Sequence, residues 1–464
     1  MRRYAMRVFL LLTASLLIVS SAYAEIKLDY GADFRLRQEI WNDVVTLGAV
    51  NTGGGADRNF LRLRTRLWGK VDFSENYGAY LRITNEMKDY GLGPYRDFKD
   101  NPDRDAYDPD EIIVDNLYAD AKNVAGLPVN IRVGRQDFIG IYGEGFLFMD
   151  GTPGDGSRTF YFNAARVNVK LTDNFNFDLT YITDPKTDIY MPSIHPSVTP
   201  TAGNAFQYED NKKVLTGSAE QAFLFYGRAK KGDLTIEPYY VYKTEDPVDG
   251  GFEATKLKLN TAGGRLLYAI KSWTMGGEFA HQWGEYDDSR RRTGNGGYVF
   301  VGNKYESLMW KPGWELRFVY LSGDDKNTPD ETKTWDPLFS RNPYWNELII
   351  YTLIPETAKY GGDIPGYWTN MDILKATITL NFDPATNLAL AYQHLWAPQS
   401  TTGLPTIIFS NSGTDRGSLP TAILNHRFSK AVDGMLQLEY FVPGDFYSTK
   451  DNALFFRWQL NLKI

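Results

Sequence analysis

Apolar and polar side chains alternate regularly from Glu25 to Trp41. The apolar set is Ile26, Leu28, Tyr30, Ala32, Phe34 and Leu36, and the polar set is Lys27, Asp29, Gly31, Asp33, Arg35, Arg37 and Glu39. Successive side chains of a β-strand point to opposite faces. The pattern therefore predicts a strand with one apolar face and one charged face.

The same alternation returns in three further segments, 61–73, 77–86 and 453–464. In the first of these, Leu61, Leu63, Leu67, Val71 and Phe73 share one face, and Arg62, Arg64, Arg66, Lys70 and Asp72 share the other. Residues 74–76 are a tight turn, so 61–86 is predicted to be a hairpin. The last segment places Leu454, Phe456, Trp458, Leu460 and Leu462 opposite Arg457, Gln459, Asn461 and Lys463.

Weaker versions of this pattern fill the rest of the chain. They predict strands near 111–122, 129–139, 159–171, 175–184, 218–230, 233–244, 256–271, 273–286, 297–309, 314–323, 371–382, 388–396, 418–430 and 435–443. With the four segments above, this makes eighteen strands. The phase is ambiguous in 111–122, 256–271 and 297–309, so we expect sixteen to eighteen.

Short and long connections alternate between the predicted strands. Bacterial outer-membrane barrels have an even number of strands, short periplasmic turns and long extracellular loops. The sequence therefore predicts an all-β fold, a transmembrane antiparallel up-and-down β-barrel formed by residues 25–464. Sixteen or more strands leave an aqueous channel unless something fills it. The loops at 140–158, 185–217 and 324–370 are long enough to fold inward.

The N-terminus has the three parts of a secretory signal peptide. Arg2, Arg3 and Arg7 precede an apolar stretch, Val8 to Val19, and Ala22-Tyr23-Ala24 is a small-residue cleavage signal. The apolar stretch is shorter than the ~20 residues that a spanning helix needs. We expect export through the Sec pathway, cleavage after Ala24 and residence in the cell outer membrane.

Composition narrows the function. Removing residues 1–24 takes away three arginines, leaving 47 basic against 57 acidic residues and a formal net charge of −10. This charge argues against a nucleic-acid partner. The chain has no cysteine, which excludes disulfides and cysteine-ligated metals. The sequence contains no HExxH and no G-x-S-x-G motif, and only four histidines, so we expect neither an enzyme nor a cofactor.

The polar faces of the predicted strands supply the candidate site. Seven arginines lie on them, which we call the arginine ladder: Arg35, Arg37, Arg62, Arg64, Arg66, Arg82 and Arg457. Because strand 1 meets strand 18 on closure, they are expected on one arc of the lumen. Guanidinium groups bind carboxylates through paired hydrogen bonds, so the ladder favours passage of an anion. The alternative is that these arginines only pair with lumen carboxylates such as Asp33, Glu39, Asp72 and Glu86.

Several short motifs resemble the alginate export family. Ile131-Arg132-Val133-Gly134-Arg135-Gln136-Asp137-Phe138 resembles its V-G-R-Q motif, and Tyr142-Gly143-Glu144-Gly145 and Asp150-Gly151 follow as they do there. Tyr320 to Asp324 resembles its S-G-D, Trp335 to Phe339 its F-D-P-L, and Tyr440 to Gly444 its Y-F-x-P-G. The resemblance implies an eighteen-stranded porin with an arginine-rich constriction that passes a polyuronate such as alginate.

The resemblance adds Arg132 and Arg135 to the expected lumen path. With regular alternation Arg135 would lie on the lipid side, beside Val133, and a bulge at Gly134 would turn it inward. Membership does not fix the cargo, and an anionic polysaccharide and a small anionic solute both remain possible. So do a general porin and a barrel that anchors partner proteins.

Other partners follow from the barrel itself. The outward face predicts contact with outer-membrane lipid and lipopolysaccharide. The amphipathic last strand resembles the signal for the barrel-assembly machinery, although it ends in Ile464 where that signal usually has Phe. An acidic run, Asp103, Asp105, Asp108, Asp110 and Glu111, lacks the glycine of a Ca²⁺-binding loop, and we interpret it as a solvated loop.

Overall fold

The computed structural model describes residues 26–44, 56–89, 107–108, 112–149, 161–194, 208–209, 212–213, 218–247, 255–325, 327–328, 330–340, 345–349, 368–401 and 406–464. The predicted signal peptide and most of the acidic run near Asp105 lie outside these residues.

Long strands make up the wall of the molecule. They are β1 (Lys27–Val44), β2 (Ala56–Asp72), β3 (Tyr77–Asp89), β5 (Ile112–Ala121), β6 (Val129–Gln136), β7 (Phe162–Thr172), β8 (Phe175–Asp184), β12 (Glu220–Lys231), β13 (Leu234–Glu245), β14 (Leu257–Ile270), β15 (Trp273–Tyr286), β16 (Arg291–Lys304), β17 (Gly313–Leu321), β19 (Met371–Asn381), β20 (Thr386–Trp396), β21 (Asp415–Ser418), β22 (Thr421–Arg427), β23 (Val432–Pro443) and β24 (Ala453–Lys463). Shorter pieces are β4 (Tyr107–Asp108), β9 (Ser193–Ile194), β10 (Tyr208–Glu209), β11 (Lys212–Lys213), β18 (Glu331–Thr332) and the single turn η2 (Val124–Gly126).

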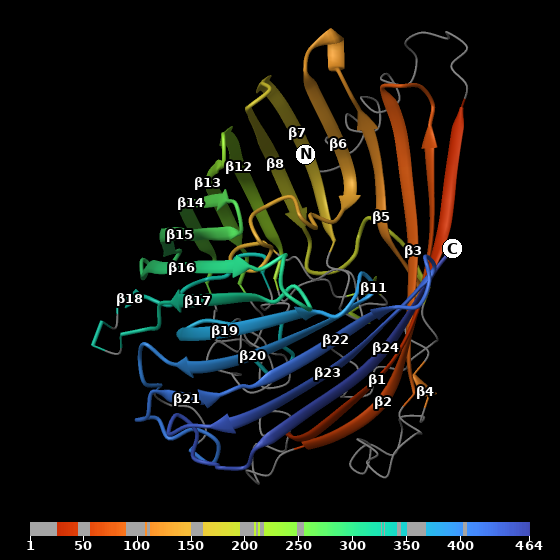
Figure 1. Cartoon of the computed structure of the whole chain (residues 1–464). Helices are drawn as coiled ribbons and strands as arrows, with labels where there is room; N and C mark the ends of the chain where they lie inside the picture. Colours follow the sequence, from red (N-terminus) through yellow and green to blue (C-terminus); the bar gives the residue numbers. More distant parts are fainter. Residues whose placement is uncertain are drawn as a thin grey trace.

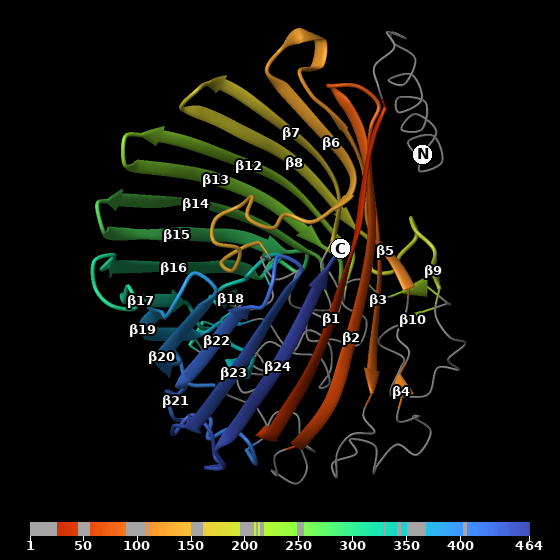
Figure 2. The same ribbon diagram turned by 45° about the vertical axis from the view of Figure 1, so that its right-hand side comes forward.

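The wall is a closed ring. Each long strand pairs antiparallel with the next along the chain, and β21 and β22 together fill one place between β20 and β23. Over the described residues this gives eighteen wall strands. Phe34 of β1 pairs with Leu462 of β24, and Figures 1 and 2 show the first and last strands side by side. The predicted barrel is confirmed.

Large apolar side chains remain exposed along one face of this wall. Phe223, Phe279 and Val299 keep 58 to 60% of their surface exposed. The same exposed face carries Leu67, Leu81, Leu179, Leu266, Leu316, Ile378, Leu390 and Leu438. Such an outward apolar band is the part of a barrel that meets lipid hydrocarbon. No helix in the described ranges is long and apolar enough to span a membrane.

The core of the molecule lies inside the ring. Two loop segments, 137–149 and 333–340, bring Phe146, Phe148 and Trp335 against inward side chains of the wall, and all three are almost fully buried. The two segments also pair with each other, because Phe339 N–H donates to the Phe148 carbonyl at 3.0 Å. The expectation that the loops at 140–158 and 324–370 fold inward is confirmed for their described parts.

Trp41 lies near the end of β1 but does not belong to the membrane interface. It is 2% exposed and packs on Phe455 with ring centroids 4.3 Å apart. Trp41 is buried because its side chain lies on the inward face of β1, as that of Glu39 does. Phe73, Trp273 and Trp310 are 42 to 46% exposed at strand ends, as an interfacial girdle requires.

Replacing Val299 with arginine tests the lipid-facing assignment. This position lies five residues from the short-turn end of β16, about midway through a hydrophobic band ~25 Å tall. Arginine near the bilayer midplane costs about 2–4 kcal/mol, so Val299→Arg should lower the free energy of unfolding in lipid vesicles by that amount. Denaturant titration of vesicle-bound protein measures it, with Val299→Leu as the control. A loss below about 1 kcal/mol would contradict the assignment.

Candidate functional site: the charged inner wall

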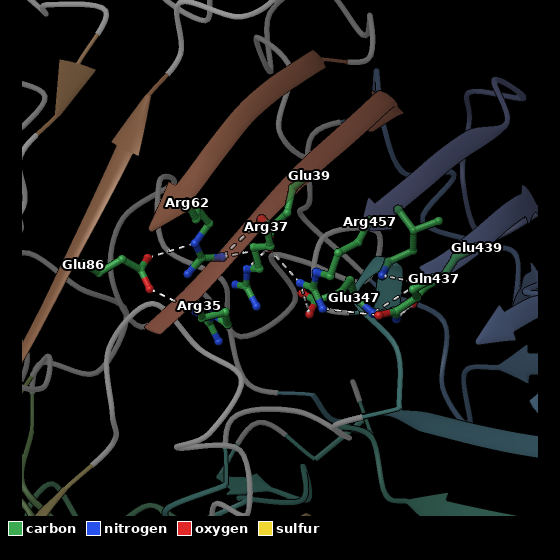
Figure 3. Close-up of polar contacts among 10 residues, drawn as sticks. Arg35, Arg37, Glu39, Arg62, Glu86, Glu347, Gln437, Glu439 and Arg457 are labelled. Carbon is green, nitrogen blue, oxygen red and sulfur yellow. Dashed lines mark hydrogen bonds and ion pairs between the residues drawn. The ribbon is translucent and has the colours of Figure 1, made fainter. Parts of the chain in front are cut away.

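Glu39 lies at the centre of the charged inner wall, beside the seam between the first and last strands. Its carboxylate makes ion pairs with Arg37 at 2.7 Å, Arg62 at 3.0 Å and Arg457 at 2.8 Å. These arginines come from β1, β2 and β24, and Figure 3 shows them converging on the one carboxylate. A single acidic group therefore links three cations across the closure of the barrel.

Glu86 on β3 continues this network along the wall. It pairs with Arg35 at 3.1 Å and with the Nε of Arg62 at 2.9 Å. Because Arg62 lies between Glu39 and Glu86, the two carboxylates share one guanidinium group (Figure 3). Five of these six groups are about 3% exposed or less, and Arg62 is 8% exposed. Charges buried to this degree need paired, hydrogen-bonded partners.

The rest of the arginine ladder is paired in the same way. Arg64 contacts Asp33 at 3.3 Å, and Arg66 lies 4.0 Å from Asp115. Arg82 donates to Asp115 at 2.9 Å and also to Asp137 at 3.0 Å. The structure therefore places all seven ladder arginines inside the barrel, and each has a carboxylate within 4.0 Å. The sequence pattern located the arginines correctly and missed Asp115 and Asp137.

Asp72 differs from the other predicted lumen carboxylates. It lies at the end of β2 and pairs with Lys70 at 2.7 Å, and its side chain is 33% exposed. It does not reach the ladder. Of the four predicted lumen carboxylates, Asp33, Glu39 and Glu86 therefore lie near the ladder and Asp72 does not.

The two arginines implied by the family resemblance have different surroundings. Arg132 faces inward and holds Asp120 through two hydrogen bonds of 2.7 and 2.9 Å. Arg135 is 1% exposed and binds both oxygens of Asp188 at 2.8 Å. Because Asp188 belongs to the segment that follows β8, Arg135 fastens a loop to the wall.

The expected bulge at Gly134 is wrong. The registers of β6 with β5 and with β7 run without a shift through Gly134. Instead, Gly134 has φ +130°, and a Cβ there would lie 2.2 Å from the Leu117 carbonyl oxygen. Only glycine fits this close approach at positive φ. The register shift lies in β5, opposite Arg82 and Ile83.

Further arginines line the inner wall beyond the predicted arc. Arg166 and Arg228 share Asp178, at 3.1 and 2.8 Å. Arg265 and Arg317, on β14 and β17, both reach Glu144 of the inward loop 137–149, at 3.6 and 2.6 Å. The seven ladder arginines lie on one arc, as expected, because β24, β1, β2 and β3 are adjacent strands. The four further arginines line other parts of the wall. The strand predicted at 256–271 has no clear alternation in the sequence, so Arg265 could not be assigned to the inward or the outward face.

Charged and amide side chains of the wall hold the inward loops in place. Arg457 binds Glu347 at 2.6 Å, and Glu439 accepts the backbone N–H groups of Glu347 and Leu348 at 3.0 and 2.9 Å. Gln282 exchanges two hydrogen bonds with the backbone of Asp336. Over the described residues, no cluster of three or more His, Cys, Asp or Glu side chains could hold a metal ion.

The family-like motifs coincide with these attachment points. Gly143 N–H donates to the Tyr226 hydroxyl at 2.9 Å, and Trp335 N–H donates to the Ser322 carbonyl at 2.9 Å. Arg317 pairs with Glu144 at 2.6 Å. The motifs at 142–145 and 335–339 thus belong to segments that pack inside the barrel. Those at 131–136 and 440–443 lie in the wall strands β6 and β23.

The barrel, its apolar outer belt and its charged inner wall define an outer-membrane channel. The sequence profile of the alginate export family, described as "Alginate export", matches residues 204–455. The chain belongs to this family. No curated protein matches it in sequence.

Solved structures support the fold. OccAB1 of Acinetobacter baumannii superposes with a TM-score of 0.54 at 10% identity, covering 96% of this chain and 99% of that one. OccK5 (OpdH) of Pseudomonas aeruginosa gives 0.52 at 11% identity, covering 96% and 100%. OccK2 (OpdF) of the same organism gives 0.55 at 10% identity, covering 94% and 98%. At this identity the likeness concerns the fold alone.

Glu39→Gln tests whether pairing at the seam stabilises the barrel. The change leaves Arg37, Arg62 and Arg457 facing a neutral amide in a buried site, and breaking a buried pair costs about 3–5 kcal/mol. Denaturant titration should show a loss of that order. Asp72→Asn is the matched control, because its partly exposed pair with Lys70 should contribute less than about 1 kcal/mol. Equal effects of the two changes would refute the central role of Glu39.

Proposed function

We propose that the protein passes an anionic solute, a uronate-rich polysaccharide such as alginate, through the lumen by passive diffusion. Membership of the alginate export family carries this proposal. The inward arginines support it, because a guanidinium group binds a carboxylate through two parallel hydrogen bonds. The proposal involves transport without a chemical step, so no catalytic residue is assigned.

A polyuronate presents a row of carboxylates at regular spacing. Conduction needs sites that attract each carboxylate but release it again. In the ladder, each arginine already has an acidic neighbour, so an entering carboxylate would exchange with Asp33, Glu86 or Glu39 for the same donors. Such exchange keeps every site weak, as passage requires. Arg132, paired with Asp120, belongs to the same class of site.

The same ion pairs favour a second candidate function. If the ladder arginines remain bound to their carboxylates, they only neutralise the acidic groups of the inner wall and do not bind the cargo. The protein would then be a general or other-cargo porin without anion preference. The near-complete burial of Arg35, Arg37 and Arg457 is the observation that favours this alternative.

The location and the remaining partners belong to the proposal as well. We place the chain in the cell outer membrane, exported through the Sec pathway with cleavage after Ala24. The exposed apolar belt suits contact with lipid and lipopolysaccharide. The last strand, which ends at Ile464, would be recognised by the barrel-assembly machinery.

Planar-bilayer recording separates the two functions. Under a salt gradient, the unmodified channel should have a reversal potential on the anion-selective side. Replacing Arg62, Arg64 and Arg66 with alanine removes three positive charges and leaves their carboxylates, so the reversal potential should move toward cation selectivity. A cation-selective parent channel, unchanged by this triple replacement, would contradict anion passage.

A charge-neutral control identifies the cause of any shift. Arg64→Gln combined with Asp33→Asn removes one pair without changing the net charge of the wall. This double variant should keep the reversal potential of the parent channel. A shift as large as that of the triple variant would mean that altered packing, not lost charge, sets the selectivity.

A further inference from the structure

A second charged feature of the inner wall lies outside the arginine ladder. It is a hollow of about 180 Å³ across β5, β6 and β7, which we call the β5–β7 hollow. Its polar lining consists of Asp120, Lys122, Asn130, Arg132, Arg166 and Asn168. The strand registers bring them together, because Asp120, Arg132 and Arg166 are successive partners across the three strands, and Asn130 is opposite Asn168.

The β5–β7 hollow carries more positive than negative charge. Asp120 neutralises Arg132 through two hydrogen bonds. Asp178 is shared between Arg166 and Arg228, so one carboxylate serves two arginines. Lys122 is exposed and forms no ion pair with any residue in the described ranges.

Arg166 also has hydrogen-bonding capacity to spare. Its Nη2 donates to Asp178 at 3.1 Å, but its buried Nε has no acceptor among the described residues. A buried donor without a partner costs free energy until an acceptor arrives. Asn130 and Asn168 add amide groups that both donate and accept, as sugar hydroxyls do.

A row of stacked groups lies on the neighbouring part of the wall. Trp68 and Tyr80 stack with ring centroids 6.2 Å apart, and Tyr80 and Tyr118 stack at 5.1 Å. The Arg132 guanidinium lies 3.8 Å from the centre of the Tyr118 ring. Gly31 makes room for the row, because a Cβ there would lie 2.7 Å from the Trp68 indole. The Arg132 guanidinium is therefore held in place by its stack on Tyr118 and by Asp120.

We propose that the β5–β7 hollow is a binding subsite for one carboxylate-bearing sugar unit of the cargo. This inference rests on the proposed function, and it names the place on the inner wall where the polysaccharide is first bound. The carboxylate is bound by the partly exposed Arg166 guanidinium and the ammonium of Lys122, and the ring hydroxyls by Asn130 and Asn168. The hollow lies beside the short turn at 122–128, the end that faces the periplasm in bacterial barrels.

Calorimetric titration of the full chain in detergent micelles tests this subsite. The probe is a mannuronate trisaccharide, compared with a neutral trisaccharide of the same length and with sodium sulfate. The combined change Lys122→Gln and Arg166→Gln removes two charge-assisted contacts and should weaken trisaccharide binding about tenfold or more. Lys122→Gln alone, at an exposed residue without an ion pair, should weaken it several-fold and leaves the fold intact.

Lys430→Gln provides the matched control, since Lys430 is an exposed lysine on a short turn between β22 and β23. It should bind the mannuronate probe like the unmodified protein. Unchanged binding in the double variant would overturn the subsite. Equal binding of the neutral sugar, or equal competition by sulfate, would overturn its assignment to a uronate. If the double variant binds the mannuronate probe normally and still passes uronate, the subsite alone is refuted. If the unmodified protein passes no uronate, the proposed function is refuted.

Discussion

The carboxylate of Glu39 joins the first, second and last strands of the barrel through three arginines, and the organisation of the inner wall follows from that contact. A closed wall has an outer face that meets hydrocarbon and an inner face that carries its charges. The inward loops bury those charges, so each must have a partner. Pairing between guanidinium and carboxylate groups therefore extends from Glu39 through Glu86 and Asp115 along the ladder. The same chemistry fastens the loops, through Glu347 on Arg457 and Glu144 on Arg317.

Because every buried charge needs a partner, the arginine ladder can bind a passing anion only in competition with its own carboxylates. A row of unpaired arginines would bind a polyanion tightly and hold it. Paired arginines offer donors that a passing carboxylate reaches only by exchange, which suits a conducting pore. At the β5–β7 hollow, Lys122 lacks an ion pair within the described ranges, and the Nε of Arg166 has no acceptor among the described residues. The proposed recognition site therefore lies apart from the ladder around Glu39.

The two-residue period was enough to predict the strands, their order and the inward phase of the ladder, because a closed wall must separate apolar from polar side chains. It could not predict what the loops do inside. Arg135 was expected in the lumen path, yet it fastens a loop through Asp188, which lies 53 positions away in the chain. Arg265 stayed unplaced because its strand lacks clear alternation. Asp115 was missed because a register shift in β5 changes its face, which no periodicity reveals.

Flux through the reconstituted channel distinguishes a polyuronate channel from a general porin. Vesicles containing the protein would be loaded with a uronate oligosaccharide or with a neutral oligosaccharide of the same length, and release would be followed over time. We expect faster release of the uronate, with its advantage reduced as salt screens the wall charges. Equal release of the two sugars at all salt concentrations, or faster release of the neutral one, would contradict a channel built for an anionic polysaccharide.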